Sequence, residues 1–247
     1  YAYMNVALGL SDNAVATGSE IASSLIRAGF FEHLPGHGDG RRHSTLPFES
    51  EFLRWMLSDA AGAVFLSSKK NTDRLSLRVE WIDHVSYAGQ YETCMYMGAV
   101  KNDDGSVTGW RRLASPREAL DQNYFALKQD VGILNEEIVK VAIDKALART
   151  IEKRNLKAGE VDWFLPHYSS HYFRDKVFEA MEKIGFAVPY EKWFTNLAYK
   201  GNTGSASIYV ILEELFHSGR LREGQKLLCF IPESGRFSMA YLLLTVV

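Results

Sequence analysis

The sequence predicts an α/β protein in which helices cover both faces of a mixed sheet. Apolar strand-like segments alternate with amphipathic helical segments along the chain. A hydrophobic content of 47% over 247 residues supplies a large core, and Gly and Pro clusters separate the segments. This length fits one large domain or two of modest size.

The first third of the chain predicts one helix and three strands. Residues 1–10 are helical in pattern up to Gly9 but carry no start signal, so we expect a helix that begins upstream of Tyr1. Residues 13–18 predict a short buried strand closed by Gly18, and residues 58–66 a small-residue turn that leads into an apolar strand. A loop-rich insertion occupies residues 29–50, and alternation over residues 75–87 predicts a long strand.

The remainder of the chain predicts a more regular alternation. Residues 88–123 are irregular, with a helix start after Ser115-Pro116. Apolar residues at helical spacing predict one long amphipathic helix from about Leu127 to Arg154. There follow strands at 161–165, 193–195, 226–231 and 237–247, and helices at 170–185 and 203–217. Residues 1–67 and 203–247 repeat the order helix, glycine, strand, loop, strand, which predicts two related halves, 1–72 and 73–247, with the first incomplete.

Composition excludes several classes of protein. A formal net charge of −2 gives no general attraction to nucleic acid or anionic lipid, and no apolar run approaches the roughly 18–20 residues that span a bilayer. Two cysteines, Cys94 and Cys229, are too few for a disulfide framework, and their apolar neighbours suggest buried strands in a reducing compartment. We expect a soluble cytoplasmic protein. His33, His37 and His43 lack a fixed ligand spacing, so we expect no metal site.

Two polar residues stand at expected strand-to-helix turns. His167 follows the strand at 161–165, and Asn202 opens the helix at 203–217. His167 could instead be satisfied by the first turn of its helix, and Asn202 could be a plain N-cap. Because such turns gather at one end of a doubly wound sheet, the two side chains could converge on one atom, as stabilisation of a thioester enolate requires.

Several stretches around these residues resemble the β-ketoacyl-acyl-carrier-protein synthase III family of the thiolase fold. They are residues 12–20, 58–64, 161–167, 201–207 and 219–225. The resemblance covers most of the chain and is weakest in 29–50 and 88–125. It implies a thiolase-like fold of two related βαβαβαββ halves, each a mixed sheet covered by helices, with the first half incomplete here.

The resemblance also implies a Cys-His-Asn active site. The cysteine thiolate takes an acyl group from a thioester, and His167 and Asn202 hold the carbonyl oxygen of a malonyl thioester, whose decarboxylation leaves an enolate. The family's cysteine opens the helix that ends at Gly9, so we expect it upstream of Tyr1. We interpret Cys94 and Cys229 as small buried hydrophobic residues.

The sequence departs from the family pattern at two places. The last tight turn usually carries a run of glycines whose backbone N–H helps to form the oxyanion hole, but here it reads Pro232-Glu-Ser-Gly-Arg-Phe. Gly235 and the N–H of Arg236 are the expected substitutes, and the bulk and charge of Arg236 suggest a specialised subfamily. Tyr172 stands where a basic residue for carrier-protein docking is expected, with Arg174 as a possible substitute. Arg41 and Arg42 could meet a phosphate of coenzyme A or phosphopantetheine, or be an ordinary surface pair.

The predicted function is a ketosynthase III-like decarboxylative Claisen condensation in fatty-acid, polyketide or related synthesis. The resemblance implies no cofactor beyond substrates carried on the phosphopantetheine of acyl carrier protein or on coenzyme A. It implies a homodimer, and neither nucleic acid nor membrane as a partner. Two alternatives stay open: an acyltransferase to an alcohol or amine, and a catalytically silent partner subunit, which a non-cysteine residue at the start of the interrupted helix would favour. We expect this chain alone to be inactive in condensation.

Overall fold

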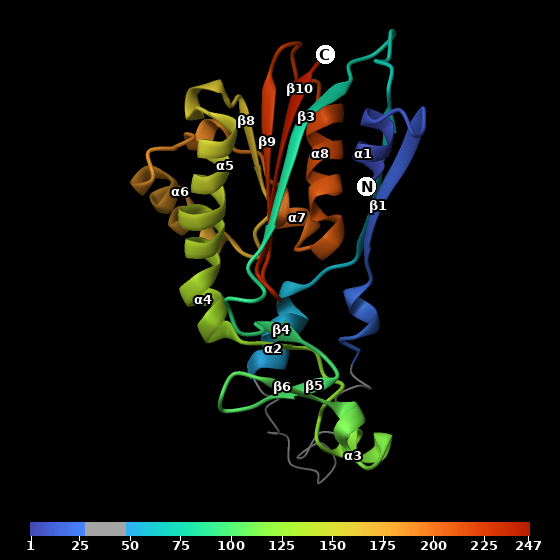
Figure 1. Cartoon of the computed structure of the whole chain (residues 1–247), viewed down its shortest axis with the longest axis vertical. Coiled ribbons are helices and arrows are strands. Elements are labelled where there is room, and N and C mark those ends of the chain that lie inside the picture. Colours follow the sequence, from blue (N-terminus) through green and yellow to red (C-terminus); the bar gives the residue numbers. More distant parts are fainter. Residues whose placement is uncertain (28–47) are drawn as a thin grey trace.

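The computed structural model describes residues 1–27 and 48–247. At its centre lies a four-stranded sheet in the order β3-β10-β9-β8 (Figure 1). Its strands are β3 (Leu77–Ser86), β10 (Ser238–Val246), β9 (Lys226–Glu233) and β8 (Trp163–Pro166). β8 runs parallel to β9, whereas β10 is antiparallel to both of its neighbours. The sheet is therefore mixed, as predicted, and the carboxyl ends of β8 and β9 lie at the same end of it.

Helices cover both faces of this sheet (Figure 1). On one face, a long helix runs without a break through α4 (Val131–Val139), the π-helical segment η4 (Lys140–Leu147) and α5 (Ala148–Arg154), and α6 (Arg174–Lys183) lies beside it. On the other face lies α8 (Ser207–His217). The predicted long helix is confirmed. The Asp130 carboxylate caps its start by accepting the N–H of Ile133, and Asn155 ends it in the left-handed conformation.

The alternation of side chains in β9 explains why both faces are covered. Leu228 and Phe230 join the apolar cluster under the long helix and α6, whereas Leu227 and Cys229 join the cluster under α8. Successive side chains of a strand point to opposite faces, so a strand that is apolar at every position must be buried on both. β9 is apolar from Leu227 to Pro232 and buried from Leu227 to Phe230, so it lies at the centre of the core.

A two-stranded antiparallel ribbon, β1 (Asn13–Glu20) with β2 (Ala60–Ser67), packs against the start of α8. A Cβ added to Gly62 would lie 2.3 Å from the Cβ of Tyr209, so only glycine lets the ribbon approach this closely. The strand predicted at residues 13–18 is confirmed, but its predicted burial is wrong. Only one face of the ribbon packs, and Val15 on the other face is 59% exposed.

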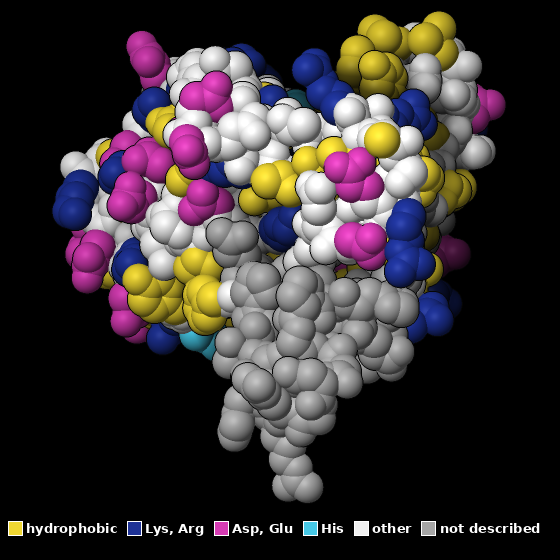
Figure 2. Space-filling view, turned by 90° about the horizontal axis from the view of Figure 1, so that it is seen from below, with side chains coloured by type: hydrophobic (Ala, Val, Ile, Leu, Met, Phe, Trp, Pro, Cys, Tyr) yellow, Lys and Arg dark blue, Asp and Glu magenta, His cyan; other side chains and the backbone are white. Residues whose placement is uncertain are grey.

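The predicted N-terminal helix is present as α1 (Ala2–Ala7), with no buried residue. Hydrophobic side chains gather at the right of Figure 2, on the side where Figure 1 places α1, β1 and β2. Elsewhere on the described part of this face, basic and acidic side chains are intermixed. No helix in the described part of the chain is long and apolar enough to cross a membrane.

Three segments differ from the prediction. The helix α2 (Phe48–Met56) was not predicted, because it starts inside the segment interpreted as a loop-rich insertion. The strand predicted at 193–195 is reduced to a single bridge between Trp193 and Phe164. Residues 88–123 are less irregular than expected, with strand β4 (Met95–Tyr96) and the pair β5 (Ala99–Lys101) with β6 (Val107–Gly109). β4 pairs with β7 (Lys128–Gln129), which lies where the long helix was expected to begin.

Short helices complete the described chain. The predicted start after Ser115 is confirmed as α3 (Pro116–Asp121), with Ser115 as its N-cap, and α7 spans Leu197–Lys200. Turns of 3-10 helix occur at Ala22–Ser24, Trp110–Arg112, Ala158–Glu160, His171–Phe173, Tyr190–Lys192 and Gly204–Ala206. The expectations for His33, His37, His43, Arg41 and Arg42 lie outside the described residues.

Candidate active site

His167 lies immediately after β8, at the carboxyl end of a parallel strand. Its backbone N–H donates to the carbonyl of Phe230 on β9, at 2.8 Å, which fixes where the chain leaves the sheet. Burial lowers the pKa of the His167 imidazole to about 4, so the ring is neutral at neutral pH and carries one N–H. Among the described residues, none forms a hydrogen bond with this ring, so the first turn of the following helix does not satisfy it.

Asn202 reaches the same end of the sheet by a different route from the one predicted. A one-turn helix, α7, precedes it instead of a strand, and Gly201 joins the two at φ +78° and ψ −178°. The Asn202 carbonyl accepts the N–H of Ser58 at 2.8 Å, which ties this turn to the start of β2.

The side chain of Asn202 is nearly buried and divided between two roles. Its Oδ1 accepts the N–H of Gly204 at 3.2 Å in a local turn. The N-cap of the following 3-10 turn is Thr203, so the interpretation of Asn202 as a plain N-cap is wrong. Its Nδ2 meets no acceptor among residues 1–27 and 48–247. The amide N–H therefore stays available to a ligand.

A small cavity lies between the turn after β8 and the start of α8. It is lined by Pro166, His167, Tyr168, Thr195, Asn196, Leu197, Gly201, Ser207 and Ile211. His167 borders it directly, and Asn202 follows the lining residue Gly201. Sequence reasoning missed Asn196, whose Nδ2 donates to Oε2 of Glu214 at 2.8 Å and thereby holds α7 against α8. Its only sequence signal is a polar residue shortly after an expected strand.

The tight turn between β9 and β10 holds the two expected oxyanion donors, Gly235 and Arg236. Both backbone N–H groups are directed at the carboxylate of Glu233. The Gly235 N–H donates to Oε1, and the Arg236 N–H lies 3.3 Å from each carboxylate oxygen. The Arg236 guanidinium turns away and donates to the carbonyl of Ala88 at 3.3 Å.

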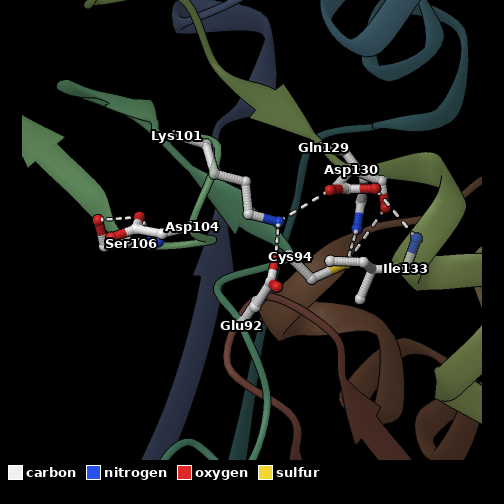
Figure 3. A network of polar contacts seen from close by, with 8 residues as sticks. All are labelled: Glu92, Cys94, Lys101, Asp104, Ser106, Gln129, Asp130 and Ile133. Carbon is white, nitrogen blue, oxygen red and sulfur yellow. Dashed lines mark hydrogen bonds and ion pairs between the residues drawn. The ribbon is translucent and has the colours of Figure 1, made fainter.

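A polar network, which includes Cys94, Gln129 and Lys101 (Figure 3), contacts this turn. The backbone N–H of Cys94 donates to the carbonyl of Gly235 at 2.9 Å. The Gln129 amide donates to Sγ of Cys94 at 3.4 Å and to Oγ of Ser234 at 3.3 Å. Beside it, Lys101 bridges Asp130 at 2.8 Å and Glu92 at 2.9 Å. These contacts place residues 92–101 and 128–130 around the turn.

Neither cysteine is suited to act as the nucleophile. Both side chains are completely buried. Burial raises the pKa of the Cys94 thiol to about 11 and that of Cys229 to about 12, so both stay protonated at neutral pH. The interpretation as a small buried hydrophobic residue is confirmed for Cys229. Cys94 is buried as expected, but its thiol also forms hydrogen bonds with Asp130 and Gln129.

The other expected binding residue is Arg174, at the start of α6. Its guanidinium lies 4.1 Å from the ring centroid of Tyr190, in a cation–π contact. Tyr172 next to it is exposed and accepts a hydrogen bond from Lys176 at 2.6 Å. Within residues 1–27 and 48–247, no group of three His, Cys, Asp or Glu side chains could hold a metal ion.

The fold is that of a thiolase-type scaffold. Residues 151–239 match the family model described as 3-oxoacyl-[acyl-carrier-protein] synthase III, C terminal. The β-ketoacyl-[acyl-carrier-protein] synthase III of Deinococcus deserti is 34% identical over 108 residues, which is 42% of this chain and 29% of the relative. The eight curated relatives compared carry this same name, and the chain spans 28% to 61% of their length.

Solved structures share the fold of almost the whole chain. The synthase III of Thermus thermophilus matches 99% of this chain and 62% of its own, with a TM-score of 0.67 and 20% identity. OleA from Xanthomonas campestris, solved with lauric acid and lauroyl-CoA, matches 99% of this chain and 61% of its own, with a TM-score of 0.71 and 20% identity. The chain thus has the thiolase fold of these solved structures, and its residues 151–239 are similar to the C-terminal part of β-ketoacyl-ACP synthase III.

Proposed function

We propose that this chain supplies the enolate-stabilising residues of a ketosynthase III-like acyltransferase. The reaction is a decarboxylative Claisen condensation of an acyl thioester with a malonyl or β-ketoacyl thioester. One observation carries the proposal: the His167 imidazole is neutral, and both its ring and the Asn202 amide nitrogen lack a partner among the described residues, at one end of the sheet.

The chemistry follows from these two donors. Loss of carbon dioxide from a malonyl thioester leaves an electron pair that delocalises onto the thioester oxygen as an enolate. An N–H of His167 and an N–H of Asn202 stabilise that oxygen as its charge develops. The neutral imidazole carries one N–H, and this is the group that donates to the oxygen. Removal of one donor of this kind typically costs about 10²–10³ in rate.

The nucleophile in this proposal is a cysteine outside residues 1–247. Cys94 and Cys229 are buried and protonated, and the chain spans only part of the length of its curated relatives. The acyl groups arrive on acyl carrier protein or coenzyme A, as the relatives' names and the lauroyl-CoA bound to OleA support. Arg174 is the proposed contact for the carrier or its phosphate. The proposal needs no further cofactor and includes a cytoplasmic homodimer.

The substitution His167→Ala tests the proposal in the protein that contains this chain together with its nucleophile. We expect carbon dioxide release from a malonyl thioester to fall by about 10²–10³. Self-acylation, followed by mass spectrometry of the intact protein, should stay near the wild-type rate. His217→Ala, at the exposed end of α8, is the matched control.

Each outcome separates the proposal from its alternatives. Carbon dioxide release that His167→Ala leaves unchanged would remove His167 from the assigned role. Acyl-enzyme that passes its acyl group to an alcohol or amine, with no release of carbon dioxide, would identify the acyltransferase. Absence of acyl-enzyme in the wild type would identify the silent partner subunit.

A further inference from the structure

The turn between β9 and β10 presents two convergent backbone N–H groups, called the pocket below, which a carboxylate of the chain itself occupies. The N–H groups of Gly235 and Arg236 converge on the carboxylate of Glu233, the last residue of β9. A Cβ added to Gly235 would lie 2.7 Å from Oε1 of Glu233, so a larger residue here would displace the carboxylate from this position. Convergent backbone N–H groups attract negative charge, whether it belongs to a side chain or to a substrate.

The direction of the Arg236 N–H is fixed by contacts on the opposite side of the peptide. The carbonyl of Gly235 accepts the N–H of Cys94 at 2.9 Å and lies 3.4 Å from the N of Met95. In a trans peptide the C=O and the following N–H point in opposite directions. Cys94 is itself fixed, because its carbonyl accepts the N–H of Asp130 at 2.7 Å and its thiol contacts Gln129. The pocket is therefore rigid on its backbone side.

The Glu233 side chain, in contrast, can move. Glu233 is exposed, and no side chain among the described residues forms an ion pair with it. Its carboxylate can rotate into solvent at the cost of its bonds to Gly235 and Arg236. A thioester oxygen that enters while the carboxylate is in place would gain negative charge beside another negative charge.

We infer that Glu233 competes with the thioester oxygen for the N–H groups of Gly235 and Arg236. The effect of Glu233 on acylation rests on the proposed function, whereas its contact with the two N–H groups does not. Acylation requires Glu233 to leave the pocket, so the wild-type residue slows entry of the acyl thioester. This sequence carries a glutamate immediately before a turn where the resembled family carries glycines.

Hydrogen exchange tests the contact without reference to activity. The probe is the rate of amide deuteration in a peptide that spans residues 232–238, measured by mass spectrometry on the protein that contains this chain and its nucleophile. Bonds to a charged acceptor are strong enough that their loss should accelerate exchange about tenfold or more in Glu233→Ala. Glu233→Gln keeps an acceptor oxygen without the charge and should give an intermediate rate. Glu223→Gln, on a remote exposed loop, is the matched control.

Self-acylation tests the consequence. We expect Glu233→Ala to form acyl-enzyme from acyl-CoA about tenfold faster than the wild type, with Glu233→Gln in between, because an unoccupied oxyanion donor contributes about 10²–10³. Exchange that is unchanged in Glu233→Ala, or acylation that is unchanged or slower, would overturn the inference. A wild type and variants that never form acyl-enzyme would refute the proposed function, and the exchange rates would still decide whether Glu233 fills the pocket.

Discussion

Gly201 offers the sharpest test of how the Asn202 turn is built. Its backbone, at φ +78° and ψ −178°, lies in a region open essentially to glycine alone, and a side chain there costs about 1–3 kcal/mol. A Cβ would also lie 2.2 Å from Oγ of Ser58 and 3.0 Å from its Cβ, an overlap that adds about 1–3 kcal/mol. Gly201→Ala should therefore lower the free energy of unfolding by roughly 2–6 kcal/mol, a large part of the total for most domains.

In urea unfolding, two further variants separate the backbone cost from the cost of the overlap with Ser58. Gly219→Ala has a similar φ of +73° but no atom within 4 Å of its Cβ, so it should show only the backbone cost. Ser58→Gly removes the overlapping atoms, so the double variant should show a coupling energy of about 1–3 kcal/mol with Gly201→Ala. If Gly201→Ala costs no more than Gly219→Ala and shows no coupling, the close approach of Ser58 is not what demands glycine here.

Two other outcomes follow from buried groups. Asp83 is 3% exposed and bonded to Arg149 and Lys153. Burial opposes its ionisation, but these bonds outweigh it and lower the pKa of Asp83 below 3.8. Its stabilisation is therefore complete above the unfolded pKa and is lost as pH falls through the folded one. Asp83→Asn should lower the free energy of unfolding by about 1.5–3 kcal/mol at pH 7. This difference from the wild type should become smaller below about pH 4. A difference, measured by urea unfolding, that is the same at pH 3 and pH 7 would contradict this. Both thiols should resist iodoacetamide at pH 8 until the protein is unfolded, because they are buried and protonated; mass-spectrometric detection of labelled Cys94 in the native protein would contradict that.

The elements that could be predicted are those whose burial is decided within a few residues of sequence. β9 is apolar at successive positions, and the helix over 131–154 repeats its apolar residues at helical spacing, so both are found from pattern alone. β1 shows the limit of that reasoning. Its residues suit a buried strand, but whether a face is buried depends on what packs there, and only the glycine face meets α8. α2 was missed because its nine residues follow a stretch with four glycines and two prolines, which indicates a loop.

The candidate site also has a part that local sequence predicts and a part that it does not. His167 and Asn202 could be found because each stands beside a local signal: a strand end for His167, and a glycine turn before a helix for Asn202. The one-turn helix before Asn202 could not be found from the sequence, because its position depends on the hydrogen bond between Asn196 and Glu214 of α8.

The state of the Gly235–Arg236 turn depends on contacts that no local pattern contains. Glycine at 235 predicts a tight turn and a close approach, but not which group approaches. That is decided by Cys94, which lies 141 residues earlier in the chain and holds the carbonyl of Gly235. Once that peptide is fixed, its N–H must face the other way, and the nearest negative charge is the carboxylate at the end of the same strand. Glu233, which the sequence analysis treats as part of a turn, thus fills the pocket formed by the N–H groups of that turn.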